Sequence, residues 1–406
     1  MRDRQEPRRL VVQDLLWHKS GSHPPREHAV SGADVQPLAG ARARGPIVIV
    51  AGAIAPYTNR LYDAYAVTHG DRLHVLTCVD VEPQRKWQMP VATHYHLEVL
   101  PGLRFHRSDL RNIYVNPAIV TRLAQLRPRA VLIGAFSPTM ALAALYAFAS
   151  GTPFGVMTDG SVDMDPGGWS SIHRRMRRMF IPRARVGVGA SDDSRTLLEQ
   201  YGLPRERSVE VPIVCPWPMP ETVPDFASRP YDVLFCGAIE EERKGAGFFA
   251  DVLIAAKAAG HTLSARIAGD GPLRPELEQR LAAAGIPAHF DGFVQPADLP
   301  AIYASAKVFA FPSRGDPWGL VVNEAMQCGT PVIGSPHAIS SLELVGTYQA
   351  GEVLALDVPS WRDALVGLLT SPERWQHFSR ARERAATRLS LAHSVERLHS
   401  ALSRIS

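Results

Sequence analysis

Residues 311–331 read FPSRGDPWGLVVNEAMQCGTP. An apolar strand from Val308 to Phe311 runs into a turn rich in proline and glycine, and the turn opens a helix that stops near Gly329. Strand, turn and helix in this order form the repeating unit of parallel α/β domains. The stretch therefore predicts an α/β fold.

Two carboxylates of this stretch, Asp316 and Glu324, are eight residues apart. On a helix this spacing is a little over two turns, so one acid at the mouth and one inside the helix can address opposite ends of an elongated polar ligand. Between them, the N–H groups of Trp318, Gly319 and Leu320 point outward at the helix start, where the helix dipole favours an anion such as a phosphate. A diphosphate flanked by hydroxyl groups suggests a sugar nucleotide.

The same run resembles the E-x7-E signature of the retaining glycosyltransferases of family 4, whose usual wording is close to E-x-F-G-L-x-x-x-E-A-M-A-C-G-x-P-V-I. Asp316 stands where the family usually has Glu, Trp318 takes the aromatic position, and the pattern departs at Gln327, where the family commonly has Ala. The resemblance implies that Glu324 holds the ribose hydroxyls of the nucleotide and that Asp316 holds the hydroxyls of the transferred sugar. Because Asp is one methylene shorter than Glu, the identity of that sugar stays open.

A second strand-to-helix junction, residues 237–245, reads GAIEEERKG. Cationic side chains at such a turn can neutralise a diphosphate leaving group. The family pattern here is G-R, a short insert and K-G, which implies that Lys244 binds the diphosphate and acts in catalysis together with Asp316. Ala238 stands where the family has its arginine, so either Arg243 supplies the second cation or Lys244 and backbone amides act alone. The alternative that Arg243 and Lys244 are solvated charges beside three glutamates stays open.

Two glycine-containing turns complete the resemblance. Residues 269–273 read GDGPL, similar to the family's G-x-G-P-x turn, and residues 291–294 read DGFV, similar to the G-x-V segment beside the nucleobase. Glycine allows the backbone to approach a planar ring. Gly52, after the first strand, resembles the glycine that lets a loop approach the donor diphosphate, although a plain strand-to-helix turn explains it equally well. The implied donor-binding residues are Gly52, Gly237, Lys244, Gly271, Phe293, Val294, Asp316, Trp318, Gly319, Leu320 and Glu324.

Length and composition allow two domains. With 406 residues, 46% hydrophobic and 21% charged, the chain can bury two cores of roughly 150–200 residues each. The resemblance implies the GT-B architecture, with two Rossmann-like domains facing an interdomain cleft and a C-terminal helix that crosses back to the first domain. We expect residues 1–45 to form a disordered or loosely docked extension, 46–212 the acceptor-side domain, 213–230 a proline-rich linker, 231–388 the nucleotide-sugar-binding domain and 389–406 the C-terminal helix.

One uncharged stretch, Ala130 to Thr158, is long enough to span a membrane. Gly134, Pro138 and the turn at residues 150–153 interrupt it, which favours a buried strand, helix and strand. The strands are expected at 130–133 and 154–157, with the helix at 138–149.

The first domain offers few chemical signals. Asp159-Gly160-Ser161 follows a predicted parallel strand, at the edge where α/β sheets bind ligands, and is a candidate for the acceptor side. His94, His96 and His106 lie in no matching motif and are not assigned. Residues 163–165 read DMD but fall in the acceptor domain, and the cysteines Cys78, Cys215, Cys236 and Cys328 lack metal-ligand spacing. We therefore expect no metal and no cofactor besides the nucleotide sugar as co-substrate.

Between Gly167 and Ser191 there are six arginines and no acidic residue: Arg174, Arg175, Arg177, Arg178, Arg183 and Arg185. Methionine, phenylalanine and isoleucine side chains interleave with them. Such a segment can lie on an anionic membrane surface, or it can be a solvated helix face with its methionines in the core.

Taken with the resemblance, these patterns predict a retaining glycosyltransferase that moves a sugar from a nucleotide-diphosphate sugar to a hydroxyl of a glycan, a lipid-linked or a small-molecule acceptor. A place in bacterial-type surface polysaccharide or glycoconjugate biosynthesis is expected. The net charge of +4 does not imply a nucleic-acid partner. Because the N-terminus lacks an apolar signal region, we expect a cytoplasmic protein, peripheral at the inner face of the cell membrane if the arginine segment binds lipid. The alternatives are a sugar-nucleotide epimerase on the same fold and a two-lobed solute-binding protein.

Overall fold

The computed structural model describes residues 45–80, 86–87, 92–108, 111–134, 137–165, 167 and 170–406. The expected N-terminal extension, residues 1–45, lies outside the described residues apart from Gly45. The remainder contains two parallel β-sheets, one in each half of the chain.

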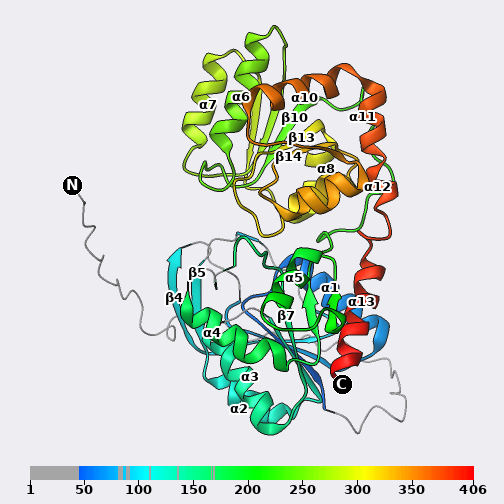
Figure 1. Cartoon of the computed structure of the whole chain (residues 1–406). Helices are drawn as coiled ribbons and strands as arrows, with labels where there is room; N and C mark the ends of the chain where they lie inside the picture. Colours follow the sequence, from blue (N-terminus) through cyan, green and yellow to red (C-terminus); the bar gives the residue numbers. More distant parts are fainter. Residues whose placement is uncertain are drawn as a thin grey trace, which may run out of the picture. The chain divides into compact units, whose positions relative to one another are not determined.

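The first domain is built on a seven-stranded parallel sheet with the order β3-β2-β1-β6-β7-β8-β9. Its strands are β1 (Ile47–Ala51), β2 (Leu73–Thr77), β3 (His96–Val99), β6 (Ala130–Gly134), β7 (Phe154–Thr158), β8 (Gly187–Gly189) and β9 (Ser208–Glu210). The helices between them are α1 (Pro56–His69), α2 (Ala118–Leu126), α3 (Pro138–Ser150), α4 (Ser171–Phe180) and α5 (Asp192–Gln200). Figure 1 labels β7 and the helices α1 to α5.

Both faces of this sheet are buried, which explains why its strands are apolar at nearly every position. Along β1, Ile47 and Ile49 pack with α1 on one face, whereas Val48 and Val50 pack with α2 and α3 on the other. Successive side chains of a strand point to opposite faces, so a strand between two layers of helices needs apolar residues at both.

The uncharged stretch folds as the sequence predicts. It forms β6, α3 and β7, with Gly151 in the left-handed conformation (φ 70°) ending the helix. Within the described part of the chain, no helix is both long and apolar enough to cross a membrane.

One feature of the first domain was not predicted. Strands β4 (Leu103–Ser108) and β5 (Arg111–Val115) pair antiparallel as a separate two-stranded ribbon. The sequence here lacks the two-residue Asn-Gly or Asp-Gly turn that signals a hairpin. In the chain, the ribbon lies between β3 and α2.

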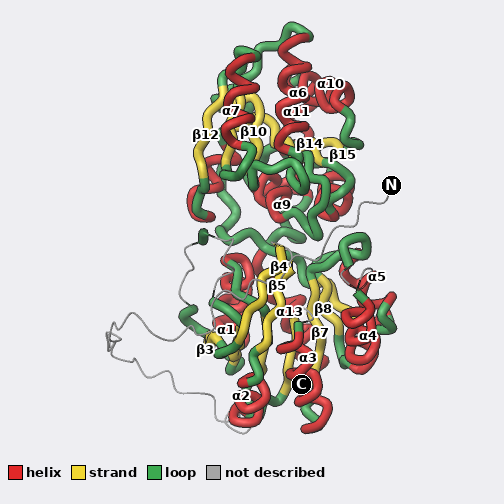
Figure 2. Tube along the Cα trace, turned by 90° about the vertical axis from the view of Figure 1, so that its left-hand side faces the viewer, coloured by secondary structure: helices red, strands yellow, loops and turns green. Residues whose placement is uncertain are grey.

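The second domain has a six-stranded parallel sheet with the order β12-β11-β10-β13-β14-β15. Its strands are β10 (Tyr231–Cys236), β11 (Ala265–Ala268), β12 (Ala288–Gly292), β13 (Ala306–Phe311), β14 (Val332–Gly334) and β15 (Gly351–Val353). Its helices are α6 (Ala246–Ala258), α7 (Arg274–Ala283), α8 (Leu299–Ala304), α9 (Leu320–Gln327), α10 (Val358–Thr370), α11 (Pro372–Ser379) and α12 (Ala381–Arg384). Figure 2 shows strands in yellow among red helices in both domains.

The side chains of β10 pack into two apolar clusters, one on each face of the second sheet. Val233 and Phe235 pack with α6 and α10, whereas Leu234 packs on the other face with Tyr303 of α8 and Val322 of α9. The last residue of the strand, Cys236, packs on this second core as well. The strand thus brings the start of the 237–245 loop to the side of the sheet that carries α8 and α9.

The chain passes between the domains twice. Residues 211–230 contain no helix or strand, and helix α13 (Leu391–Ile405) returns to the first domain. Val395, Leu398 and Ile405 of α13 pack in the same cluster as β1 and α1. Figure 1 shows α13 in red near α1. The spacing of three, four and seven residues between its buried positions is that of a one-sided apolar helix. The predicted return of the C-terminal helix is confirmed.

Candidate functional site

Helix α9 begins where the sequence predicts. Gly319 precedes it with φ 92°, and a Cβ at that position would lie 2.7 Å from Ser340 Oγ and 3.0 Å from the Phe311 ring. Both the backbone angle and the space therefore require glycine. The Gly319 carbonyl accepts from Val322 N at 3.0 Å, which closes the first turn. The N–H groups at this helix start are the outward-facing amides expected to meet an anion.

The side chain of Trp318 does not line an open site. It is 4% exposed, and its Nε1 donates to Asn323 Oδ1 at 2.9 Å. Asn323 Nδ2 in turn donates to the carbonyl of Ile213 at 3.0 Å. The indole fixes the turn, so Trp318 can contribute to donor binding through its backbone amide.

Asp316 lies outside the helix, four residues before its start. It pairs as an isolated β-bridge with Ala338, and its N–H donates to the His337 carbonyl at 3.1 Å. The idea that the eight-residue spacing to Glu324 represents two helical turns is therefore wrong, because Pro317 and Gly319 keep the intervening chain out of the helix. The two acids still project from one strand-to-helix junction.

Lys244 and Asp316, predicted separately from motifs 72 residues apart, form an ion pair. Lys244 Nζ lies 2.5 Å from Asp316 Oδ2, with both side chains less than one-fifth exposed. Nζ also lies 5.8 Å from the centre of the Phe311 ring. The pair brings one cation to the mouth of the donor helix.

The 237–245 loop is fixed against the 311–316 turn. The Arg243 carbonyl accepts from Arg314 N at 2.7 Å and from Ser313 Oγ at 3.0 Å. Gly245 has φ 64°, and a Cβ there would lie 2.3 Å from the Pro312 carbonyl. These contacts hold Lys244 beside Asp316.

Arg243 is already paired on its own loop, since its Nη2 lies 3.0 Å from Glu240 Oε1. Its assignment as a second cation at the diphosphate remains a prediction. It would require the guanidinium to leave Glu240 or to share it.

The glycine turns at 237, 269–271 and 292 pack backbone on backbone. Gly237 N donates to the Ala268 carbonyl, and Gly269 N donates to Gly292 O at 2.8 Å. A Cβ on Gly269 would lie 1.8 Å from Gly237 O, and one on Gly271 would lie 2.5 Å from Ile239 O. Phe293, directly after this group, is 40% exposed and is available to a ligand.

Glu324 is buried on α9 with 4% of its surface exposed. Tyr303 Oη donates to Glu324 Oε2 at 2.7 Å. Burial raises the pKa of Glu324 from 4.5 to about 7, while the tyrosine hydrogen bond acts in the opposite direction. Tyr303 was missed by sequence reasoning, because nothing in an isolated tyrosine 21 residues upstream points to Glu324.

Cys236, the last residue of β10, packs on the same core as Tyr303. Burial, with the charge of Glu324 as a further cause, raises the pKa of its thiol to about 12, whereas Tyr303 and Lys244 lower it. Tyr303 and Glu324 form one polar pair of this region, and Lys244 and Asp316 form the other.

The first domain approaches the turn that carries Asp316. A Cβ on Gly315 would lie 3.7 Å from the terminal methyl of Met164, in the loop after β7. Asp159, the acceptor-side candidate, directly follows β7 and is exposed. Gly52 lies near Tyr114: a Cβ on Gly52 would lie 3.4 Å from the Tyr114 ring.

Asp165, the last residue of the DMD segment at 163–165, is engaged inside the first domain. Asp165 is buried, forms an ion pair with Arg177 and accepts a hydrogen bond from the Tyr201 hydroxyl. Among the residues that the structure describes, no cluster of three or more His, Cys, Asp or Glu side chains could hold a metal ion. His94, which pairs with Asp63 at 2.9 Å, is a surface contact of the first domain.

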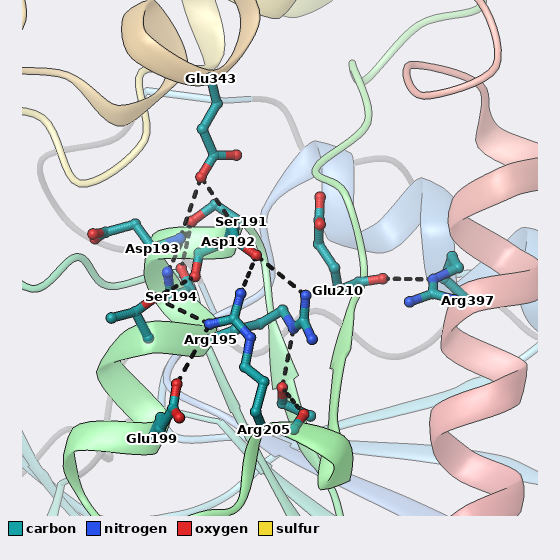
Figure 3. Close-up of polar contacts among 12 residues, drawn as sticks. Ser191, Asp192, Asp193, Ser194, Arg195, Glu199, Arg205, Glu210, Glu343 and Arg397 are labelled. Atoms are coloured by element: carbon teal, nitrogen blue, oxygen red, sulfur yellow. Dashed lines mark hydrogen bonds and ion pairs between the residues drawn. The ribbon is translucent and has the colours of Figure 1, made fainter. Parts of the chain in front are cut away.

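A second polar cluster links the domains (Figure 3). Glu343, on the helical turn Ser341–Gly346, accepts from the N–H groups of Asp192 and Asp193 at 3.0 and 3.2 Å. These amides are the start of α5 in the first domain, where a carboxylate is favoured by the helix dipole. Arg388 lies 2.6 Å from Glu210 Oε1 and stacks 5.9 Å from the ring of Trp318. The turn that carries Trp318 is therefore braced by the chain that returns to the first domain.

Comparison with known proteins agrees with this geometry. Residues 230–371 match the family described as "Glycosyl transferases group 1". This match lies in the second domain and covers about a third of the chain.

Two curated relatives match in part. A segment of 73 residues is 47% identical to the sulfoquinovosyl transferase SQD2 of Arabidopsis thaliana, covering 18% of this chain and 14% of that protein. A segment of 143 residues is 33% identical to a GDP-mannose-dependent alpha-(1-6)-phosphatidylinositol dimannoside mannosyltransferase of Mycobacterium tuberculosis, covering 35% of this chain and 36% of that protein. The chain spans well under half of the length of these curated relatives.

A solved structure matches over nearly its whole length. Anabaena Alr3699/HepE in complex with UDP has a TM-score of 0.69 and 17% sequence identity, covering 88% of this chain and 99% of that one. The likeness shows the fold. The predicted GT-B class with two Rossmann-like domains is confirmed.

Proposed function

We propose that this protein is a retaining glycosyltransferase that transfers a sugar from a nucleotide-diphosphate donor to a hydroxyl group. The observation that carries the proposal is the Lys244–Asp316 ion pair at the start of α9, on the same junction as the buried Glu324. A bound donor would contact both polar pairs. Glu324 would meet the ribose diol, Lys244 and the helix-start amides the diphosphate, and Asp316 the sugar.

Donor binding would rearrange the ion pair. A diphosphate carries more negative charge than one carboxylate, so it would draw Lys244 Nζ away from Asp316 and leave that carboxylate to accept hydrogen bonds from the sugar. Charge on the diphosphate grows as the glycosidic bond breaks, and a positioned cation stabilises that state more than the bound donor.

The acceptor would enter from the side of Asp159 and Met164. Its hydroxyl oxygen attacks the anomeric carbon, the bond from that carbon to the diphosphate oxygen breaks, and the hydroxyl proton passes to a donor phosphate oxygen. Retention of configuration is inferred from the resemblance to the retaining family. Catalysis then consists of alignment and charge stabilisation, without a protein nucleophile.

A thermal-shift screen against UDP-, GDP- and ADP-sugars tests the proposal. One nucleotide class, at 100 times its dissociation constant, is expected to raise the melting temperature by about 5–10 °C. The shift and the subsequent turnover should be unchanged by EDTA, since we propose transfer without a metal. Turnover that requires added manganese contradicts the metal-free mechanism, and turnover without any acceptor favours the epimerase alternative.

The acceptor is proposed to be lipid-linked or otherwise presented at an anionic membrane, with the protein on the cytoplasmic side. On α4, Ile172 and Met179 are 70% and 43% exposed and lie seven residues apart on one helix face, with Arg175 between them. Apolar side chains flanked by arginines suit the headgroup region of such a membrane. One of the relatives above is named for a phosphatidylinositol-based acceptor.

Not every arginine of this segment can serve the membrane. Arg177 is buried against Asp165, with its guanidinium 5.4 Å from the Tyr201 ring, so its assignment to the lipid-binding set is wrong. Its inward position follows from the helix spacing, since Phe180, three residues on, is buried as well.

Reversing the exposed charges of α4 should release the protein from membranes. The double variant Arg175→Glu/Arg178→Glu is expected to bind liposomes containing phosphatidylserine at least about 30-fold more weakly, at about 1 kcal/mol per arginine. Flotation measures this. Arg380→Glu/Arg404→Glu, which changes the net charge equally at exposed sites elsewhere, should bind like the wild type. Wild-type protein that remains with the soluble fraction contradicts the membrane contact.

A further inference from the structure

Tyr303 of α8 is held rigidly beside helix α9. It is fully buried, and its ring packs edge-on against Phe309 at 5.5 Å between centroids. Its carbonyl accepts from Thr330 Oγ1 at 2.8 Å and from Arg229 Nη1 at 3.4 Å. The hydroxyl at the end of this ring therefore has a fixed position.

That hydroxyl determines the orientation of Glu324. Oε2 of the carboxylate receives the tyrosine hydrogen bond at 2.7 Å, which is the hydrogen bond that the described residues give to this side chain. The Glu324 side chain keeps a small exposed part, since the residue is 4% exposed. One oxygen is thus bound from below, and the other remains available to a ligand.

The surroundings of Glu324 make its charge sensitive to this contact. The titratable side chains near its carboxylate are Tyr303, Cys236, Cys215 and Cys328. Burial raises the pKa of each of the three thiols and of the tyrosine, so all four are neutral near pH 7. Two cations act on neighbours of Glu324: Lys244 lowers the pKa of the Cys236 thiol, and Arg229 lowers the pKa of the Cys328 thiol. Near neutral pH, the charge of this cluster of five side chains therefore depends on whether Glu324 is ionised, which its hydrogen bond to Tyr303 influences.

We propose that Tyr303 is a positioning residue for donor binding, which holds Oε2 of Glu324 so that Oε1 accepts hydrogen bonds from the ribose diol of the nucleotide. The inference rests on the proposed function. A carboxylate accepts from a diol with both lone pairs of Oε1, whereas a protonated acid competes as a donor. Tyr303 favours the form that binds, because a hydroxyl donating to the carboxylate stabilises its charge.

The test compares Tyr303→Phe with the wild type by calorimetry between pH 6 and pH 9. Binding of the nucleoside diphosphate identified by the screen is measured beside its 2′,3′-dideoxy analogue. The ratio of the two affinities cancels the ionisation of the phosphates and reports the diol contact alone. In the wild type this ratio should rise with pH through about 7, following Glu324. In Tyr303→Phe the ratio should be about 10-fold lower at pH 7 and its midpoint about one pH unit higher.

Controls separate the possible failures. Tyr146→Phe removes a hydroxyl that donates to the Leu123 carbonyl at 3.2 Å in the first domain, and it should leave the ratio and its midpoint unchanged. If the wild type binds no nucleoside diphosphate, the proposed function fails. If the wild type binds with a ribose preference and Tyr303→Phe keeps the same ratio and midpoint, the inference alone is overturned, even where the variant melts earlier.

A second variant tests the same role if Tyr303→Phe folds poorly. Site-specific 3-fluorotyrosine at position 303 keeps the hydroxyl and makes it a stronger donor. It should lower the midpoint of the ratio by a few tenths of a pH unit, and an unchanged midpoint contradicts the positioning role.

Discussion

Lys244→Met is expected to lower kcat/KM for sugar transfer about 100- to 1000-fold, the range found when one preorganised charge-stabilising group is removed. Methionine keeps the length of the side chain and its packing near Phe311, but it offers no charge to the departing diphosphate. Because the charge on the leaving oxygen grows in the transition state, kcat should fall more than KM rises. Steady-state kinetics with the donor from the screen measures both.

The control is Lys257→Met, in the last turn of α6 of the same domain, which should retain wild-type kinetics. A fall in activity of less than about 10-fold for Lys244→Met would remove the cation from the mechanism. In that case the 2.5 Å contact with Asp316 would be a structural ion pair between two turns.

Glu324→Gln is expected to abolish the nucleotide-induced thermal shift while making the free protein more stable at alkaline pH. The loss of binding follows from replacing an acceptor-only carboxylate with an amide whose NH2 group cannot accept from the ribose diol. The gain in stability follows from burial, since a buried carboxylate at pH 8 carries a charge that the folded state disfavours.

The direction with pH follows from linkage. The folded-state pKa of Glu324, about 7, lies above its ordinary value of 4.5, so its stabilising contribution is complete below pH 4.5 and is lost as the pH rises to about 7. At about 1.4 kcal/mol per pH unit, the wild type loses about 3 kcal/mol over this interval relative to Glu324→Gln. Denaturant unfolding at pH 5 and pH 8 measures the difference.

Glu276→Gln, at an exposed position on α7, provides the matched control and should follow the wild type at both pH values. Nucleotide binding by Glu324→Gln with wild-type affinity would contradict the proposed hydrogen bonds between Glu324 and the ribose. Equal pH dependence of wild type and variant would show instead that Glu324 ionises normally.

The sequence determined the two-domain α/β organisation because its signals are local. Apolar strands ending at Gly52, Gly237 and Gly269 are followed by helices, and the uncharged stretch from Ala130 to Thr158 is divided by its own glycines and prolines. The donor helix could be predicted for the same reason, since Gly319 adopts a backbone angle that glycine favours.

Only the tertiary structure decided which of these residues meet. Lys244 contacts Asp316 because β10 and β13 are adjacent in the sheet, and Tyr303 reaches Glu324 because α8 and α9 pack on one face of it. Arg177 turned inward because Asp165 and Tyr201 lie beneath α4. Local backbone preferences depend on residues that are neighbours in the sequence, whereas the pairing and burial of charges depend on contacts between distant segments.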